Sequence, residues 1–191
     1  MQIGLFFGTF NPIHIGHMAL ANYMLAYNNL DEIWFVISPH NPLKEKASLL
    51  NQNQRLYMVN VAVEDFPKFK SSTIEFHLPQ PSYTINTLAH LKEKFPQHTF
   101  SLIIGQDNLV NFDKWKNHEE ILKNHKLLVY PRPNCGKSNF DSHPNVVLTN
   151  APLMEISSTF IRNAIKDKKD IRFFVTEKVW DYIDSMNLYK K

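Results

Sequence analysis

Residues 1–17 read MQIGLFFGTFNPIHIGH, and this stretch decides how the rest of the sequence is interpreted. Its opening apolar run predicts a buried strand. Gly8 permits a sharp turn directly after that run, while Pro12 fixes its own φ angle and favours an extended Asn11. Apolar residues at helical spacing come next, so a helix is expected to begin near Ile15. The stretch therefore predicts a strand, a tight loop and a helix.

Apolar runs of strand length alternate with amphipathic segments along the rest of the chain. Strands are expected at residues 1–7, 32–38, 72–76, 99–105, 126–132 and 145–150. Helices are expected at residues 15–28, 49–66, 82–95, 113–124, 157–169 and 176–188, with N-caps at Ser82, Asp113, Ser157 or Ser158, and Thr176. Nearly continuous apolar strands that alternate with helices form parallel sheets covered on both faces. The predicted fold class is α/β: a doubly wound, mainly parallel sheet with a helical C-terminus.

No shift in composition divides the 191 residues, so a single domain over residues 1–191 is expected. No segment resembles a signal peptide or approaches the roughly 20 apolar residues needed to cross a bilayer. The single cysteine, Cys135, allows no disulfide within the chain and favours the cytoplasm. A net charge of +3 without a Lys/Arg block suits small anions and argues against nucleic-acid or membrane partners. The oligomeric state stays open, with a homo-oligomer among the states considered.

The start of the expected first helix is suited to bind an anion. The first N–H groups of a helix have no partner inside it, and the helix dipole adds positive charge there. His14 and His17 are three residues apart, so their rings can share one side of the first turn. Two imidazoles can hydrogen-bond charged oxygens and stabilise the negative charge that develops in a transition state. The sequence thus predicts a phosphate site between the first strand and the first helix.

Besides a phosphate site, the two histidines have two other interpretations. The pair could bind a metal ion, but HxxH lacks the glutamate and the i, i+4 spacing of a zinc-protease helix, so no metal ligand is assigned. The rings could be ordinary core or surface residues, which their framing by Gly8, Pro12 and Gly16 disfavours. Neither GxxxxGK[ST] nor GxGxxG occurs at the first turn, and this excludes two common phosphate-binding loops.

A second group of phosphate-binding residue types lies near the other end of the chain. Residues 156–162 read ISSTFIR, in which three hydroxyls open a helix and Arg162 follows them. Hydroxyls, unpaired helix N–H groups and a guanidinium can hold phosphate oxygens together. An ordinary serine N-cap with a solvated arginine explains the same residues, so this segment alone does not decide its role.

Together, GTFNPIHIGH and ISSTFIR resemble the (H/T)xGH and ISSTxIR motifs of the nucleotidyltransferase superfamily, which transfers a nucleotidyl group from a nucleoside triphosphate to a phosphate or alcohol. The resemblance implies a Rossmann-like nucleotidyltransferase fold. It implies that the catalytic residues are His14, His17, Lys44 and Arg162. It implies ATP binding by Gly8, Thr9, Phe10, His14, Gly16, His17, Gly105, Asp107, Ile156, Ser157, Ser158, Thr159 and Arg162. Many members carry Asp at the position of Asn11, where Asn keeps the shape and removes the charge.

The middle of the chain resembles one family of that superfamily, the bacterial nicotinate-nucleotide adenylyltransferases. The resemblance rests on the segments SPHNPLKEK, YTINTL, IIGQDNLVNFDKWKNHEEIL and LLVYPRP. It implies that Trp115 stacks on a pyridine ring and that Thr87 offers backbone contacts, which suits a flat ring that carries a carboxylate. The residues assigned to the pyridine mononucleotide are Asn11, Lys44, Thr84, Thr87, Trp115 and Arg132.

Several of these residues have a plainer interpretation. Lys44 resembles a lysine near the triphosphate, or it is a solvated loop residue. Trp115 could belong to the core of an amphipathic helix. Asp107 could cap a short helix, which would not prevent the contact with ribose or metal-bound phosphates that the resemblance implies. Arg55 and Arg132 are candidates for positive charge near the site, although positions on a helix surface and a loop surface explain them equally well.

The expected function is adenylyl transfer from ATP to nicotinate mononucleotide, which gives deamido-NAD and pyrophosphate. Magnesium is expected to arrive with ATP, held by the triphosphate and water. One alternative is another adenylyl- or cytidylyltransferase of the superfamily, with nicotinamide mononucleotide or phosphopantetheine among its acceptors. The other alternative is a nucleotide-binding regulator without turnover.

Overall fold

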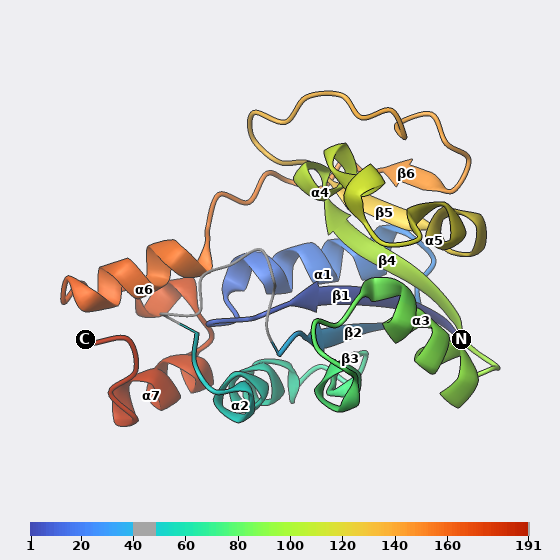
Figure 1. Ribbon diagram of the computed structural model, residues 1–191. Coiled ribbons are helices and arrows are strands. Elements are labelled where there is room, and N and C mark those ends of the chain that lie inside the picture. The colour runs from blue at the N-terminus through green and yellow to red at the C-terminus, as the bar shows by residue number, and fades with distance from the viewer. Residues whose placement is uncertain (40–48, 191) are drawn as a thin grey trace.

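Residues 1–39 and 49–190 are described by the computed structural model, and within them six strands form one parallel sheet (Figure 1). The strand order is β3-β2-β1-β4-β5-β6. The strands are β1 (Gln2–Gly8), β2 (Glu32–Ile37), β3 (Phe69–Ser72), β4 (Thr99–Gly105), β5 (Leu127–Tyr130) and β6 (Val146–Leu148). The order reverses between β1 and β4, and ligands of such sheets bind where the carboxyl ends of the strands flank this reversal. The predicted fold class is confirmed.

Helices cover both faces of the sheet, as a doubly wound fold requires. One face carries α1 (Ile15–Tyr27), α2 (Gln52–Val63), α6 (Ser158–Lys166) and α7 (Glu177–Ser185). The other carries α3 (Thr84–Lys94), α4 (Gln106–Val110) and α5 (His118–Asn124). Three short 3-10 helices complete the described elements: η2 (Ile74–His77), η3 (Phe112–Lys114) and η4 (Arg172–Phe174).

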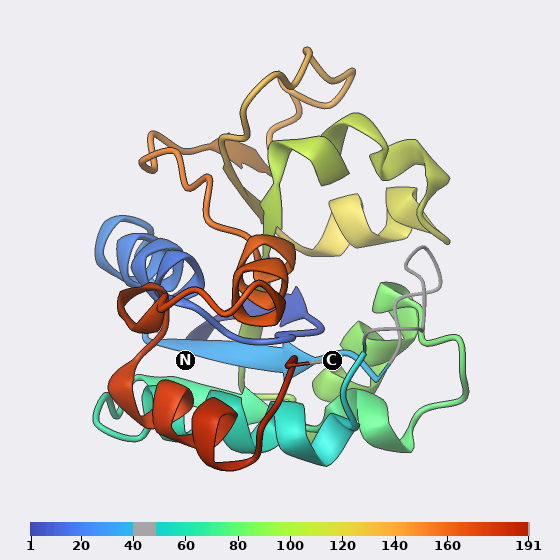
Figure 2. The same ribbon diagram turned by 90° about the vertical axis from the view of Figure 1, so that its left-hand side faces the viewer.

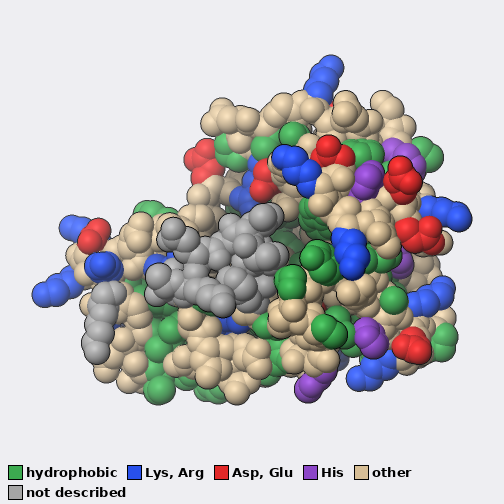
Figure 3. Space-filling view, viewed as in Figure 1, with side chains coloured by type: hydrophobic (Ala, Val, Ile, Leu, Met, Phe, Trp, Pro, Cys, Tyr) green, Lys and Arg blue, Asp and Glu red, His purple; other side chains and the backbone are tan. Residues whose placement is uncertain are grey.

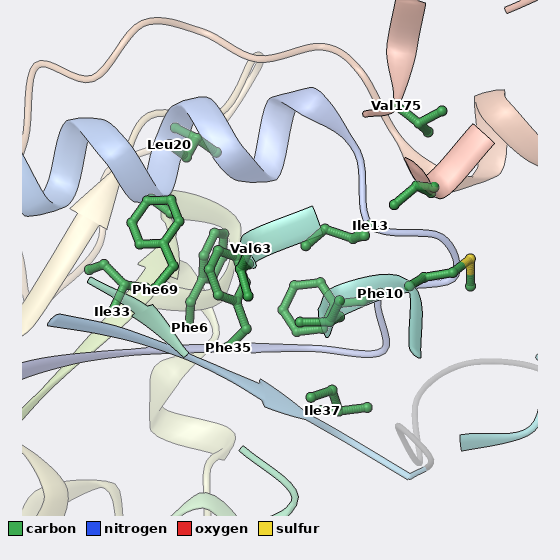
Figure 4. Packing of buried hydrophobic residues seen from close by; sticks show 14 of the residues in the cluster. Phe6, Phe10, Ile13, Leu20, Ile33, Phe35, Ile37, Val63, Phe69 and Val175 are labelled. Carbon is green, nitrogen blue, oxygen red and sulfur yellow. The ribbon is translucent and has the colours of Figure 1, made fainter. Parts of the chain in front are cut away.

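Alternate residues of the central strands pack into two separate hydrophobic cores. Leu5 joins the core under α3, α4 and α5, whereas its neighbour Phe6 joins the core under α1, α2, α6 and α7. Successive strand side chains point to opposite faces, so a strand covered on both sides reads as a continuous apolar run. Figure 4 shows the second of these cores, in which Phe6, Phe10 and Phe35 lie close together. The rings of Phe6 and Phe10 meet edge to face at 6.1 Å.

Most helices occur where the sequence predicts them. The first begins at Ile15, and α6 begins directly after Ser157, whose Oγ accepts a hydrogen bond from the Phe160 N–H at 3.1 Å. A serine that satisfies one of the unpaired N–H groups is the preferred N-cap. The expected cap at Ser82 is wrong, because α3 begins at Thr84 with Tyr83 as its N-cap residue.

The strand expected at residues 72–76 is wrong in position. The strand that pairs with β2 is β3, whose register joins Phe69 to Ile33 and Ser72 to Val36. The chain then forms η2, which buries Glu75. The Thr87 hydroxyl donates a hydrogen bond to this carboxylate at 2.9 Å. The turn therefore gives a buried carboxylate a partner, which a continued edge strand would not do.

The single helix expected at residues 113–124, with Asp113 as its cap, is also wrong. Asp113 lies in η3, and α5 begins only at His118. Asn117 separates them with a left-handed φ of 54°, which asparagine tolerates better than most residues. This break lets Phe112 become fully buried while Trp115 packs on it at a ring-centroid distance of 5.1 Å.

The carboxyl ends of the strands point toward the side of the molecule that Figure 2 presents. In that view α6 (orange) lies between α1 (blue) and the pair formed by α2 and α7. The helix with the hydroxyl-rich start is thus brought to the loop that leaves β1, although the two are separated by most of the sequence.

Candidate active site

His14 and His17 lie against each other at the start of α1. Their ring centroids are 3.6 Å apart with an interplanar angle of 29°, so the rings stack. The His14 backbone N–H donates a hydrogen bond to His17 Nδ1 at 3.2 Å. A neutral ring whose Nδ1 accepts a hydrogen bond carries its proton on Nε2. The expectation that the two rings share one side of the first turn is confirmed.

The Phe10 ring packs against the His17 ring. Its ring centroid lies 5.2 Å from that of His17, and the rings meet edge to face. Phe10 is 2% exposed and points into the core, as Figure 4 shows, and its φ of 45° is unusual for a bulky residue. The Phe10 side chain therefore lies in the core and packs against His17.

Burial keeps His14 uncharged. Its side chain is only 5% exposed, and burial, with the Arg132 charge as a second cause, lowers the pKa of His14 to about 4. A charged imidazolium would have to give up most of its hydration at this place. In the nucleotide-free protein at pH 7 the ring is thus a neutral hydrogen-bonding group.

We expect the stability of the nucleotide-free protein to fall as the pH falls from 6.5 to about 4. In that range the unfolded chain protonates residue 14 and the folded chain does not, so lower pH favours unfolding. The lowered pKa corresponds to about 3 kcal/mol. Urea denaturation across this range should show this loss, and a His14→Gln variant should lack it. Equal pH dependence of the two proteins would contradict the assignment to His14.

The hydroxyl-rich start of α6 contacts the loop after β1. Ser158 Oγ donates a hydrogen bond to the Pro12 carbonyl at 2.9 Å, and Arg162 Nη1 donates one to the Asn11 carbonyl at 2.9 Å. Arg162 Nη2 also donates to Thr159 Oγ1 at 3.3 Å. The two segments that the sequence analysis paired as one phosphate site are therefore in direct contact.

Arg55 connects three backbone segments beside this loop. It lies on α2, is 1% exposed, and donates hydrogen bonds to four carbonyls. Nη1 bonds to Thr9 at 2.7 Å and Ser38 at 2.8 Å, Nη2 to Pro39 at 2.8 Å, and Nε to Leu50 at 3.0 Å. Burial lowers its pKa to about 10, so the guanidinium remains charged at pH 7. Of the two interpretations left open for Arg55, the surface position is wrong.

Asp107 and Arg132 face each other where β4 and β5 end. Arg132 Nε lies 3.6 Å from Asp107 Oδ1, and Arg132 Nη2 donates a hydrogen bond to the Tyr130 hydroxyl at 3.3 Å. A Cβ on Gly105 would overlap the Asp107 carboxylate, so only glycine leaves room for this arrangement. Because β1 and β4 are neighbours, this group and the histidine loop flank the reversal of strand order.

The residues assigned to the pyridine mononucleotide lie in separate places. Arg132 belongs to the group just described and Asn11 to the loop after β1, whereas Thr84 begins α3 and Trp115 directly follows η3. Lys116 Nζ lies 4.6 Å above the ring of Tyr83, so these last two segments are adjacent. Thr87 is buried, and its N–H bonds to the Tyr83 carbonyl at 3.2 Å. The Thr87 N–H is thus engaged within the first turn of α3.

The remaining assigned residues lie around the first loop, with one exception. Gly8 ends β1, Thr9 follows it, and Ile156 approaches α1 so closely that a Cβ on Gly16 would lie 3.5 Å from the Ile156 Cβ. Lys44 falls outside the described residues.

A family model described as cytidylyltransferase-like matches residues 5–164. The chain is 57% identical over 193 residues to a probable nicotinate-nucleotide adenylyltransferase of Flavobacterium psychrophilum, with 100% of each chain covered. It is 49% identical to a protein of the same name from Bacteroides thetaiotaomicron, and the alignment covers 96% of this chain and 91% of the Bacteroides protein. The chain belongs to the nicotinate-nucleotide adenylyltransferase family. The resemblance that the two motifs and the middle segments carry is thereby confirmed.

A solved member of the nicotinate-nucleotide adenylyltransferases shares the fold. The Plasmodium falciparum nicotinic acid mononucleotide adenylyltransferase, solved in complex with NaAD, superimposes with a TM-score of 0.83. The match covers 99% of this chain and 97% of that one at 23% sequence identity. The strand arrangement is thus retained across a wide divergence in sequence.

Within residues 1–39 and 49–190 of this adenylyltransferase-family chain, no group of three or more His, Cys, Asp or Glu side chains is placed to hold a metal ion. No helix in the same residues is both long and apolar enough to cross a membrane.

On the face shown in Figure 3, acidic, basic and histidine side chains are interspersed over the side formed by α3, α4 and α5.

Three features of this family member escaped the sequence analysis: the carbonyl-binding role of Arg55, the buried Glu75 and the hydroxyl of Tyr189, which reaches the first loop. Arg55 gave a signal, because Met58 and Val59 place it on the buried stripe of its helix. A charged residue on such a stripe needs several partners. No comparable sequence pattern marks Glu75 as buried or Tyr189 as a contact of the first loop.

Proposed function

We propose that this protein transfers the adenylyl group of ATP to nicotinate mononucleotide and releases pyrophosphate. The product is the deamidated form of NAD. The observation that carries the proposal is the contact between the His14–His17 loop and the Ser158–Arg162 corner at the carboxyl end of β1. The names of the full-length relatives support the same activity.

The reaction requires positioning and charge stabilisation more than proton transfer. A phosphate oxygen of the mononucleotide forms a bond to the α-phosphorus of ATP, and the bond from that phosphorus to the bridging oxygen of pyrophosphate breaks. The leaving group takes the electron pair. The attacking phosphate is already anionic near pH 7, so no general base is needed. Hydrogen-bond donors aimed at the transferring group are then the main source of catalysis.

Each residue of the corner has a role in this proposal. His14 and His17 hydrogen-bond the oxygens of the transferring phosphate, and the N-terminus of α1 adds its dipole. Arg162 binds the β- and γ-phosphates with Lys44, and together they stabilise the departing pyrophosphate. Arg162 donates hydrogen bonds to the Asn11 carbonyl and to Thr159 Oγ1. Binding of the triphosphate would exchange these neutral acceptors for anionic ones.

Magnesium would accompany ATP in the proposed reaction. Asp107 faces Arg132 rather than other carboxylates, which suits a metal held mainly by phosphate oxygens and water. When bound, the ion would neutralise charge on the triphosphate.

The proposed pyridine site lies toward α3 and η3. Trp115 is only partly buried, so it can offer an aromatic face to a pyridine ring while its other side packs on Phe112. Thr84 stands at the first turn of α3, where N–H groups are available to a carboxylate. Arg132 supplies positive charge near the mononucleotide phosphate in this proposal.

Pyrophosphate release with a panel of substrates tests the proposal. ATP should be combined with nicotinate mononucleotide, nicotinamide mononucleotide, phosphopantetheine or no acceptor, and CTP should replace ATP in a parallel series. We expect the highest kcat/KM with ATP and nicotinate mononucleotide. Turnover with phosphopantetheine alone would make the acceptor wrong, and preference for CTP would make the donor wrong. Nucleotide binding without release in any mixture would indicate a regulator.

A further inference from the structure

The last residues of the chain return to the loop after β1. Beyond α7, the backbone reverses through Asn187 and Tyr189, whose φ angles are 50° and 62°. Leu188 between them is buried, and its N–H donates to the Ile183 carbonyl at 2.9 Å. A left-handed conformation is uncommon for a bulky residue such as tyrosine. Figure 2 shows the red end of the chain rising from α7 toward the centre of that view.

The Tyr189 side chain ends on Asn11. Its hydroxyl donates a hydrogen bond to Asn11 Oδ1 at 2.9 Å, and the same oxygen accepts one from the Leu50 N–H at 3.3 Å. The Asn11 carbonyl accepts the hydrogen bond from Arg162. Asn11 is 4% exposed. One residue of the first loop is thus held from three directions: the chain terminus, the segment before α2, and α6.

This contact fixes the loop that carries the histidines. Asn11 is followed by Pro12, whose carbonyl binds Ser158, and His14 comes two residues later. Hydrogen bonds from both sides of Asn11 limit how far this short segment can move. Catalytic donors lose effect when they are displaced by about 1 Å, so a brace on the loop affects the reaction without touching substrate.

The chemistry of the contact suits a site for a polyanion. Burial raises the pKa of the Tyr189 phenol even though Arg55 and Arg162 oppose the rise, so the hydroxyl stays a neutral donor. The amide of Asn11 is also neutral. Because both groups are neutral, their contact adds no negative charge beside Arg162. The phenol–amide pair thus holds the loop without placing a negative charge beside the Arg162 guanidinium.

We propose that Tyr189 is a positioning residue for the transfer reaction, acting through Asn11 on the loop that carries His14 and His17. The inference rests on the function proposed above. It concerns a hydroxyl that acts through Asn11 and need not contact either substrate.

The test compares Tyr189→Phe with Tyr182→Phe. The first change removes one hydroxyl and keeps the ring, and the second does the same to a tyrosine of α7 whose ring packs on Tyr57. We expect Tyr189→Phe to lower kcat about tenfold with KM for ATP within about twofold of the original value, since positioning acts on the transition state. Tyr182→Phe should leave both constants unchanged.

A double-mutant cycle separates positioning from general destabilisation. In an Asn11→Ala background, Tyr189→Phe should lower kcat by less than about twofold, because the hydroxyl has already lost its acceptor. An undiminished kcat in Tyr189→Phe, or an equal loss in both backgrounds, would overturn the proposal. The proposal would also be overturned if the whole loss in kcat/KM of Tyr189→Phe came from a higher KM for ATP.

Amide hydrogen exchange gives a readout that does not depend on turnover. The peptide that spans residues 9–14 should exchange faster in Tyr189→Phe than in Tyr182→Phe, at matched thermal stability. Unchanged exchange would overturn the positioning role. If the unaltered protein failed to turn over nicotinate mononucleotide, the proposed function would fall, and the exchange rates would still decide whether Tyr189 braces the loop.

Discussion

Replacing His17 with alanine is expected to lower kcat for adenylyl transfer by at least about a hundredfold, the usual loss when one preorganised transition-state donor is removed. Three contacts make His17 a preorganised group: stacking on His14, the hydrogen bond from the His14 N–H, and edge-to-face packing on Phe10. A ring held in this way loses little freedom when the transition state forms. Pyrophosphate release at saturating ATP and nicotinate mononucleotide measures the effect.

The control for this variant is His90→Ala. His90 is an exposed histidine of α3, 3.7 Å from Glu93 on the same helix, and its removal should leave kcat unchanged. Circular dichroism and thermal denaturation should show that both variants fold. A His17→Ala protein that keeps kcat within about threefold would mean that the ring does not contact the transferring group, since the loss of such a donor costs far more.

The second large effect is expected on stability, in Arg55→Met. Methionine can fill part of the space but leaves four partly buried carbonyls without the donors that the buried guanidinium supplies. Each buried polar group that loses its partner costs about 1–3 kcal/mol. We expect the free energy of unfolding to fall by at least about 4 kcal/mol, which is a large part of the stability of most domains. Urea denaturation followed by circular dichroism measures the change.

Two further variants make this expectation testable even if Arg55→Met does not fold. Arg55→Lys keeps the charge and some of the hydrogen-bond donors, so its stability should lie between that of Arg55→Met and that of the original protein. Arg172→Met removes an exposed arginine that pairs with Asp170 at 2.8 Å, and its urea midpoint should match that of the original protein. Equal midpoints for Arg55→Met and Arg172→Met would show that the buried hydrogen bonds add nothing.

The parts of the fold that follow from local pattern could be predicted. Strands that are apolar throughout, such as β1 and β4, are identifiable because both of their faces are buried. The start of α6 was predictable because Ser157 is a strong N-cap. The meeting of the His14 loop with the Ser158 corner followed from the residue types and from resemblance, since spacing along the chain does not reveal it.

The parts that depend on tertiary partners could not be predicted. Residues 113–124 have helical periodicity, yet Asn117 interrupts the helix with a left-handed φ, and Phe112 and Trp115 before it pack in the core. Residues 72–76 resemble a strand, yet Glu75 turns away to reach Thr87. Arg55 resembles a surface residue until four carbonyls gather around its guanidinium. In each instance a distant group overrides the local preference.

The separation of Asn11 from Arg162 and Tyr189 has a consequence for synthesis on the ribosome. The loop after β1 is synthesised early, but its contacts come from positions 162 and 189, which are translated about 150 residues or more after it. Likewise, the second edge of β1 cannot pair until β4, about a hundred residues later in the sequence, has been synthesised. A nascent chain should therefore acquire no competent pocket before residues 162 and 189 have been synthesised, and fragments that end before residue 162 should be inert rather than partly active.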